Sequence, residues 1–257
     1  MQALHFARDL GIAVPPEQVI VSAGGKQAIF HALLATIDPG DEVLIPAPWW
    51  VSYPEIVRFA GGTVVPIETS AAGGFRITAT QLAAAITPRT RWLLLNSPGN
   101  PTGAVYSAEE LRALGAVLAR HPQLLVMSDD IYAPLRYTPG IHATLAAVCP
   151  DLAERVLTVS GVSKSHAMTG LRIGLATGGA QVDVGDEVDA LPRLRDLHLR
   201  NGQVQGRWQL RHASLERDGF LDHDVFFRHV IVETFAAGFH RSDLVDHIIA
   251  IHDFAKH

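Results

Sequence analysis

Short apolar runs alternate with helical patterns through the first 178 residues, and this alternation limits the fold more than any other feature of the chain. Seven runs are rich in leucine or β-branched residues and have the length of strands. They are Gln18–Ser22, Glu42–Pro46, Thr63–Ile67, Arg91–Asn96, Leu124–Ser128, Arg155–Ser160 and Arg172–Thr177. The pattern predicts an α/β fold with a mostly parallel seven-stranded sheet and helices on both faces.

Four segments between these runs have the spacing of helices. They are Lys26–Ile37, Ser52–Ala60, Thr80–Ile86 and Ser107–Arg120. The last begins with Ser107-Ala-Glu-Glu110, the pattern of a capping box, in which the two side chains bond otherwise free backbone amides. Ligands of such sheets bind at the carboxyl ends of the strands, so a site is expected in the loops that follow the runs.

The composition changes near Gly178-Gly179. Fourteen of the 15 prolines and 16 of the 22 glycines precede this point, whereas eight of the 13 histidines follow it. We therefore expect one domain over residues 1–178 and a divergent, mainly helical segment over residues 179–257, with helices at Glu187–Leu199 and Asp222–Phe254. The histidines of this segment lack the spacing of metal ligands, so packed or solvated histidines are expected and no metal.

Composition also excludes several classes of protein. The net charge of -5 argues against nucleic acid as a partner, because that would require clustered Lys and Arg. Apolar stretches stay shorter than the roughly 18 residues of a membrane span, so no membrane partner is expected. The one cysteine, Cys149, cannot form an intramolecular disulfide. The first ten residues do not have the pattern of a secretory signal, and a cytoplasmic location is expected.

The strongest chemical signal is Ser160-Gly-Val-Ser-Lys-Ser-His-Ala-Met-Thr-Gly-Leu-Arg-Ile-Gly174. A lysine placed like Lys164, after a buried strand and among small residues, can lose its charge by burial and attack an aldehyde. Ser160, Ser163 and Arg172 offer hydroxyl and guanidinium donors for a phosphate. Taken alone, the segment fits a solvated basic loop equally well.

Three further loops carry polar groups after predicted strands. Leu125-Val-Met-Ser-Asp-Asp-Ile-Tyr132 ends a strand with two acids and a tyrosine, and Asn96-Ser-Pro-Gly-Asn-Pro-Thr-Gly103 forms a proline-rich turn. Ala23-Gly-Gly-Lys-Gln27 opens a helix and can bind phosphate through its amides. Each signal alone also fits a plain turn or a helix cap.

Together and in this order, these segments resemble the fold-type I pyridoxal-phosphate enzymes of the class I and II aminotransferase family. The resemblance runs from about Ala7 to Gly178 and includes the family's lysine signature around Lys164. Pro46-Ala-Pro-Trp-Trp-Val-Ser-Tyr-Pro-Glu55 and the Asn-Pro-Thr-Gly turn resemble the bacterial aspartate aminotransferase branch. The first 178 residues would then be an incomplete pyridoxal-phosphate-binding large domain, truncated at the N-terminus.

The resemblance implies a set of catalytic and ring-binding residues. Lys164 would form the Schiff base with pyridoxal 5'-phosphate, and Asp129 would hold the pyridine nitrogen protonated. Asn100 and Tyr132 would bond the ring oxygen, with Tyr132 counted among the catalytic residues. Trp50 would stack on the ring.

The resemblance also implies a phosphate site and a reaction. Gly25, Lys26, Ser160 or Ser163, and Arg172 would surround the phosphate. By the same resemblance, Lys26 would have a second role toward the distal carboxylate of a dicarboxylic substrate. The implied reaction transfers an amino group from an amino acid such as aspartate to a 2-oxo acid. A homodimer is expected, as in the family.

Residues after Gly178 do not match the family's small domain. No counterpart of the family's arginine for the substrate α-carboxylate is recognised there, so slow amino transfer is expected. Two alternatives to an aminotransferase stay open: a catalytically inactive cofactor-binding remnant, and a lyase of the same fold, since cofactor chemistry branches after the same covalent link.

Overall fold

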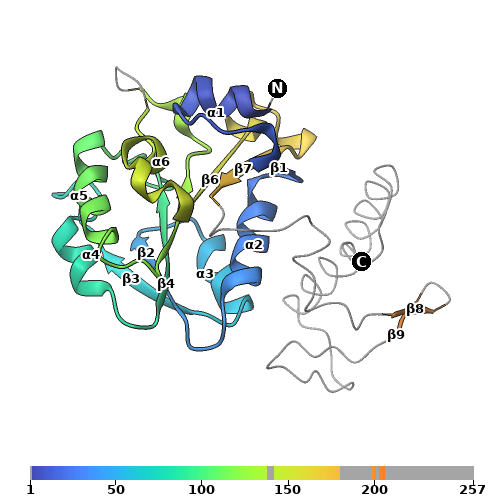
Figure 1. Cartoon of the computed structure of the whole chain (residues 1–257), viewed down its shortest axis with the longest axis horizontal. Helices are drawn as coiled ribbons and strands as arrows, with labels where there is room; N and C mark the ends of the chain where they lie inside the picture. Colours follow the sequence, from blue (N-terminus) through green and yellow to red (C-terminus); the bar gives the residue numbers. More distant parts are fainter. Residues whose placement is uncertain (1, 138–141, 180–197, 201–202, 206–257) are drawn as a thin grey trace. The chain divides into compact units, whose positions relative to one another are not determined.

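The computed structural model describes residues 2–137, 142–179, 198–200 and 203–205 of the 257-residue chain. The chain divides into two compact units, Met1–Ala190 and Leu191–His257. The first unit contains the large sheet and the helices around it (Figure 1).

The sheet of the first unit has seven strands in the order β1-β7-β6-β5-β4-β2-β3. Their bounds are Val19–Ser22 (β1), Glu42–Ala47 (β2), Thr63–Glu68 (β3), Thr90–Asn96 (β4), Leu125–Asp129 (β5), Val156–Gly161 (β6) and Gly174–Gly178 (β7). Only β7 runs opposite to its neighbours, pairing antiparallel with both β1 and β6. The predicted mostly parallel seven-stranded sheet is confirmed.

Helices lie on both faces of this sheet (Figure 1). The α-helices are Gln2–Leu10 (α1), Gly25–Thr36 (α2), Ser52–Phe59 (α3), Ala79–Ala85 (α4), Ala108–Leu118 (α5), Leu145–Val148 (α6) and Val162–Ser165 (α7). Short 3-10 turns are Pro16–Gln18 (η1), Ala133–Leu135 (η2), Pro150–Arg155 (η3) and Thr169–Leu171 (η4). The predicted capping box opens α5, where the Ser107 hydroxyl accepts from the Glu110 amide and Glu110 accepts from the Ser107 amide.

Two apolar cores, one on each face, follow from the alternation of side chains along the strands. In β4, Trp92 and Leu94 join the core beneath α2 and α3, whereas Leu93 and Leu95 join the core beneath α4, α5 and α6. Trp92 is fully buried and its indole N–H donates to Thr36 at 2.8 Å. Apolar side chains and helices therefore cover both faces of the sheet, and a ligand is expected to bind at the strand ends.

The start of β7 differs from the prediction, which placed Arg172 inside a strand. Arg172 adopts a left-handed backbone with φ of 51°, which no strand residue can have, and β7 begins at Gly174. The apolar pattern of the segment did not reveal this turn. As a result, the Arg172 side chain belongs to a loop at the strand end.

In the second unit, the structure describes a two-stranded antiparallel hairpin formed by His198–Arg200 (β8) and Gln203–Gln205 (β9). The helix predicted at Glu187–Leu199 is therefore wrong at residues 198–199. Asn201-Gly202, between the strands, is typical of two-residue hairpin connections, a signal that outweighs the weak helical spacing. Residues 187–197 and the helix predicted at Asp222–Phe254 lie outside the described residues.

No helix of the described residues has the length and apolar character needed to cross a membrane.

Candidate active site

The predicted site residues come together because their strands end at one edge of the sheet. Parallel strands share their carboxyl-end edge, so the loops after β1, β4, β5 and β6 lie there. Since β7 is antiparallel, its beginning reaches the same edge, with Gly174 paired to both Ser22 and Gly161. Lys164 and Arg172 are thereby brought next to the loops that carry Gly24 and Asp129.

A glycine-rich turn and Arg172 form the first part of the site. Gly24 has φ of 89°, which favours glycine, and a Cβ there would collide with the Arg172 guanidinium. Arg172 donates to the carbonyl oxygens of Ala23, at 3.2 Å, and Thr169, at 3.3 Å. Gly25 begins α2, so its free amide and the guanidinium are available to one anion.

Lys26 adds a second cation to this part of the site. Its Nζ lies 4.9 Å from the centre of the Trp50 ring. Burial lowers the pKa of Lys26, and the nearby charge of Arg172 lowers it further. Within the described part of the chain, neither Lys26 nor Arg172 pairs with a carboxylate. Two adjacent cations without an acidic partner fit a dianion such as a phosphate.

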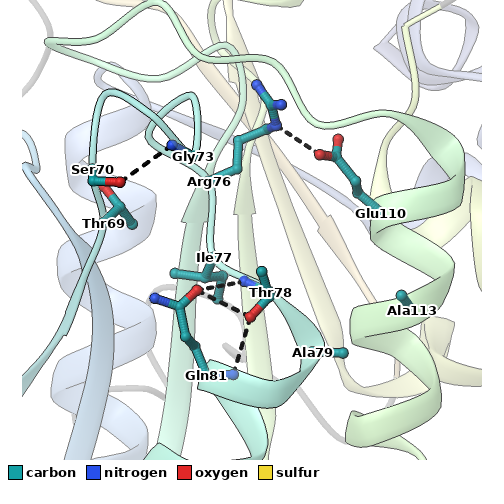
Figure 2. Close-up of a pocket in the computed structure, with 10 residues that line it drawn as sticks. All are labelled: Thr69, Ser70, Gly73, Arg76, Ile77, Thr78, Ala79, Gln81, Glu110 and Ala113. Atoms are coloured by element: carbon teal, nitrogen blue, oxygen red, sulfur yellow. Dashed lines mark hydrogen bonds and ion pairs between the residues drawn. The ribbon is translucent and has the colours of Figure 1, made fainter.

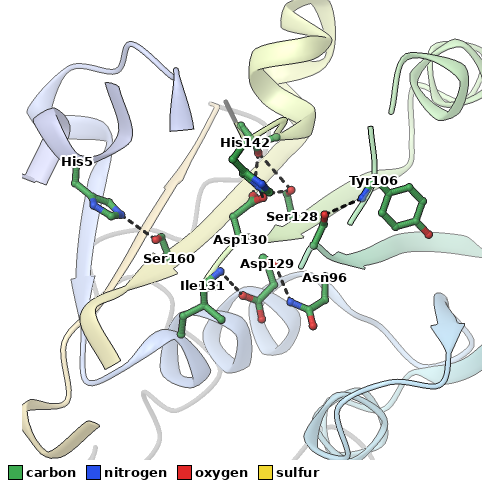
Figure 3. Close-up of polar contacts among 11 residues, drawn as sticks. His5, Asn96, Tyr106, Ser128, Asp129, Asp130, Ile131, His142 and Ser160 are labelled. Atoms are coloured by element: carbon green, nitrogen blue, oxygen red, sulfur yellow. Dashed lines mark hydrogen bonds and ion pairs between the residues drawn. The ribbon is translucent and has the colours of Figure 1, made fainter. Parts of the chain in front are cut away.

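Asp129, the last residue of β5, is a buried acid with no cationic partner among the described residues. Its Oδ2 accepts from the Tyr53 hydroxyl at 2.6 Å. Its Oδ1 accepts from the Ile131 amide at 3.2 Å (Figure 3). Burial raises the pKa of Asp129 to about 6, against the lowering effect of these two bonds. A cationic group bound next to Asp129 would compensate its charge.

This shifted pKa predicts a pH dependence of stability for the chain without ligand. The folded state binds the Asp129 proton more tightly than the unfolded state, whose aspartates titrate near ~3.9. The stabilising contribution is therefore complete below about pH 4 and is lost as the pH rises through about 6, a change of about 3 kcal/mol. Urea unfolding at pH 4 to 7 should show this loss, and the Asp129→Asn variant should lack it; parallel curves for the two proteins would contradict the prediction.

Lys164 lies in α7, directly after β6, and its side chain is exposed. The Lys164 Nζ is 5.8 Å from the centre of the Tyr132 ring. The side-chain amide of Asn100 donates to the Tyr132 hydroxyl at 3.4 Å. The backbone amide of Asn100 donates to the Asn96 side-chain oxygen at 2.8 Å. Asn96 also donates to the backbone oxygen of Asp129 (Figure 3). The loops after β4 and β5 are thus tied to each other beside the lysine.

Trp50 packs edge-to-face on Tyr53, with ring centres 5.3 Å apart. Because Tyr53 in turn donates to Asp129, the indole of Trp50 is held near the buried acid. The preceding Trp49 packs against the core beneath α2 and α3, as expected for a structural aromatic residue.

The two serines differ in their surroundings. Ser163 is buried in α7 next to Lys164. The Ser160 hydroxyl bonds His5 of α1 at 2.8 Å (Figure 3), and His5 also contacts Asp9 at 2.8 Å. On β6, the Val159 side chain faces Gly25, so Ser160, one residue further, points to the other face of the sheet. This geometry makes Ser163 the better placed of the two for a ligand near Lys164.

Sequence reasoning missed Tyr53 and Asn96 as parts of the site. Tyr53 lies in the first turn of α3, and its amide donates to the oxygen of Trp50, which precedes the helix, at 3.0 Å. The short separation of the two aromatic residues in the sequence is the local signal that links them. The apolar run Arg91–Asn96 predicts Asn96 only as the end of a strand. The contact of His5 with Ser160 joins residues 155 positions apart and has no local sequence signal.

A cavity of about 310 Å³ lies away from these residues, between the loop after β3 and helices α4 and α5 (Figure 2). Its polar lining is already paired: Arg76 contacts Glu110 at 2.7 Å, and Gln81 caps α4. None of the candidate site residues lines this cavity. This cavity is therefore separate from the candidate site at the edge where Lys164 lies.

The geometry fits pyridoxal 5'-phosphate: a pair of cations and a free amide suit its phosphate, and a buried acid suits its ring nitrogen. Lys164 lies at the same edge of the sheet, beside Tyr132. A seven-stranded α/β sheet of this order, with a lysine after β6 and an acid at the end of β5, has the fold of the pyridoxal-phosphate-dependent aminotransferases.

Comparison with known proteins agrees with this class. A model of the family "Aminotransferase class I and II" matches residues 1–198, and the chain belongs to that family. The match extends twenty residues beyond Gly178, where the sequence resemblance was expected to end.

Individual relatives cover the same part of the chain. An aspartate/prephenate aminotransferase of Cereibacter sphaeroides is 52% identical over 177 residues, which are 69% of this chain and 44% of that protein. The crystal structure of the aspartate aminotransferase from Rhizobium meliloti has a TM-score of 0.69 and 48% identity, covering 71% of this chain and 46% of the other. Aspartate aminotransferase from Thermus thermophilus with maleate has a TM-score of 0.66 and 46% identity, covering 74% and 48%. The chain spans about half the length of these relatives.

Proposed function

We propose that the chain binds pyridoxal 5'-phosphate and acts as an aminotransferase that moves an amino group from an amino acid such as aspartate to a 2-oxo acid. One observation carries the proposal: at the edge where Lys164 lies, the site combines a buried acid that lacks a cation with two cations that lack an acid. A ligand with a cationic ring nitrogen and a phosphate compensates both.

Each side chain then has a role that follows from its position. Arg172, Lys26 and the Gly25 amide bind the phosphate, with Ser163 nearby in α7. Asp129 bonds the ring nitrogen and holds its proton, while Tyr53 keeps the carboxylate oriented. The paired Asn100 and Tyr132 bond the ring oxygen. Trp50 covers one face of the ring.

When bound, the cofactor supplies an electron sink for the pair released from the substrate's α-carbon. Lys164 would hold the cofactor covalently, with Nζ bonded to the former aldehyde carbon and water released. With a substrate amine in its place, the free Lys164 amine would be the base that carries a proton from the substrate's α-carbon to that cofactor carbon. The exposed position of Lys164 gives its amine the freedom for both tasks.

Lys26 supports a dicarboxylic substrate. It stands between the phosphate-binding turn and Trp50, with a lowered pKa caused by burial and by Arg172. Relatives named for aspartate, and one relative described with the dicarboxylate maleate, agree with this substrate class.

We further propose that the protein forms a homodimer in the cytoplasm. Large apolar side chains are exposed around the site: Val51 at 75%, Leu171 at 56%, Met168 at 42% and Leu135 at 41%. Exposed apolar groups of this size gathered near one site are typical of surfaces that a second subunit covers. The single thiol of Cys149 suits a reducing compartment.

Borohydride trapping tests the cofactor site directly. The chain has only three lysines, Lys26, Lys164 and Lys256, so peptide mapping gives a clear result. After incubation with pyridoxal 5'-phosphate and reduction, the label is expected on the peptide that contains Lys164. Label on Lys26 or Lys256 alone, or no label, would contradict the proposal. Label without measurable transfer from aspartate to 2-oxoglutarate would identify a cofactor-binding chain that lacks aminotransferase activity.

A further inference from the structure

Asp130, the residue after Asp129, is completely buried on the opposite face of β5. Its Oδ2 accepts from the hydroxyls of Ser128 and Thr144, each at 2.8 Å, and its Oδ1 contacts the His142 Nε2 at 2.6 Å. Figure 3 shows Asp130 beside Ser128 and His142, whereas Asp129 lies beside Ile131 and Asn96. Two consecutive acids are therefore buried back to back at the end of one strand.

The protonation of His142 decides the charge of this cluster. His142 Nδ1 is buried and has no hydrogen-bond partner in the described part of the chain. A doubly protonated ring would bury an Nδ1–H that has no acceptor, which is costly. In the neutral ring with its proton on Nε2, that proton is donated to Asp130, and Nδ1 carries no proton. All three donors to Asp130 are then neutral, and its carboxylate carries an uncompensated negative charge.

The backbone around Asp130 connects this cluster to the candidate site. The Asp130 amide donates to the Val159 oxygen of β6, and the Asp130 oxygen accepts from the Ala133 amide, both at 2.9 Å. These bonds fix the turn that carries the Ile131 amide, which in turn donates to Asp129. A shift of the Asp130 side chain would therefore move Asp129 and the following Tyr132.

We propose that Asp130 is a positioning residue for Asp129: an ionised carboxylate, held by Ser128, Thr144 and neutral His142, that fixes the end of β5 and places negative charge behind the cofactor-binding acid. The significance of this charge for catalysis rests on the proposed function of Asp129. A negative charge behind Asp129 favours a proton on the ring nitrogen that Asp129 bonds. The raised pKa of Asp129, due first to burial and partly to Asp130, agrees with this arrangement.

Nuclear magnetic resonance of the full chain without cofactor tests both parts of the proposal. In the wild type, nitrogen-15 shifts of His142 should report a neutral ring with its proton on Nε2 at pH 7; a doubly protonated ring would overturn the proposal. This measurement uses the wild-type chain, so it remains valid even if Asp129→Asn, Asp130→Asn or Thr144→Val fails to fold.

The second measurement follows the carboxyl titration of Asp129 by carbon-13, with the signal assigned by its absence in Asp129→Asn. In Asp130→Asn, which removes the charge and keeps the shape, the midpoint should fall by about one pH unit. In the matched variant Thr144→Val, which removes one donor and keeps the charge, the midpoint should fall by less than half as much. An unchanged midpoint in Asp130→Asn, or equal shifts in the two variants, would overturn the proposal.

These measurements use no cofactor, so their outcome is separate from the borohydride experiment. A shifted Asp129 midpoint together with no label on Lys164 would retain the coupling of the two acids and remove the proposed function. A label on Lys164 together with an unchanged Asp129 midpoint in Asp130→Asn would support the proposed function and overturn the coupling of the two acids.

Discussion

Replacing Lys164 by alanine is expected to abolish covalent capture of pyridoxal 5'-phosphate and to lower amino transfer by at least about 10³-fold. The lysine amine has two tasks in the proposed function, attachment of the cofactor and movement of the substrate's α-proton, and alanine can perform neither. Mass spectrometry of the borohydride-reduced protein measures the first effect. A coupled assay of transfer from aspartate to 2-oxoglutarate measures the second.

Lys26→Ala is the matched control for this experiment. It removes another amine from the same site but leaves the amine beside Tyr132 in place. The Lys26 variant should therefore still be labelled at Lys164, with weaker cofactor binding because one of the two phosphate cations is lost. If Lys164→Ala were labelled to the wild-type extent, another residue would be the attachment site.

Replacing Asp129 by asparagine is expected to weaken cofactor binding by roughly 30-fold to several-thousand-fold. Removing one partner of a buried charge pair costs about 2 to 5 kcal/mol, and each ~1.4 kcal/mol is a factor of ten. Asparagine keeps the shape of the side chain and an oxygen for the Tyr53 hydroxyl, but it cannot compensate a cationic ring nitrogen. The loss is therefore due to charge, and it is measured as the dissociation constant of pyridoxal 5'-phosphate by fluorescence titration.

Asp151→Asn provides the control, because it changes the net charge equally at an exposed position in η3. This variant should bind the cofactor like the wild type. Tyr53→Phe should give an intermediate loss, since it removes one hydrogen bond to Asp129 and leaves the charge. Equal affinities of the wild type and Asp129→Asn would show that Asp129 does not contact the ring nitrogen.

Sequence alone predicted the strands well because their apolar patterns are local. The run Leu124–Ser128 was predicted and β5 spans Leu125–Asp129, so the acid is at the strand end as expected. The capping box of α5 was equally clear, since Ser107 and Glu110 interact within one turn of the helix. Patterns of this kind depend only on neighbouring residues and need no knowledge of the fold.

Contacts between distant segments were beyond sequence reasoning. The antiparallel direction of β7, which brings Arg172 to Gly24, depends on the left-handed turn at Arg172 and on how the strand pairs with β1 and β6. The bond from Tyr53 to Asp129 joins residues 76 positions apart. No periodicity within either segment indicates such a bond.

The sequence by itself determined the α/β class, the strand positions, and which residue types stand after each strand, because burial imposes a period on apolar side chains wherever they lie in the chain. Only the tertiary structure decided which polar groups meet: it left Lys26 and Arg172 without an acid and Asp129 without a cation in the described part of the chain. It also placed Asp130 against His142 on the far face of the same strand. The physical reason is that charge compensation and desolvation depend on distances across the sheet, which strand order and register set and no local pattern contains.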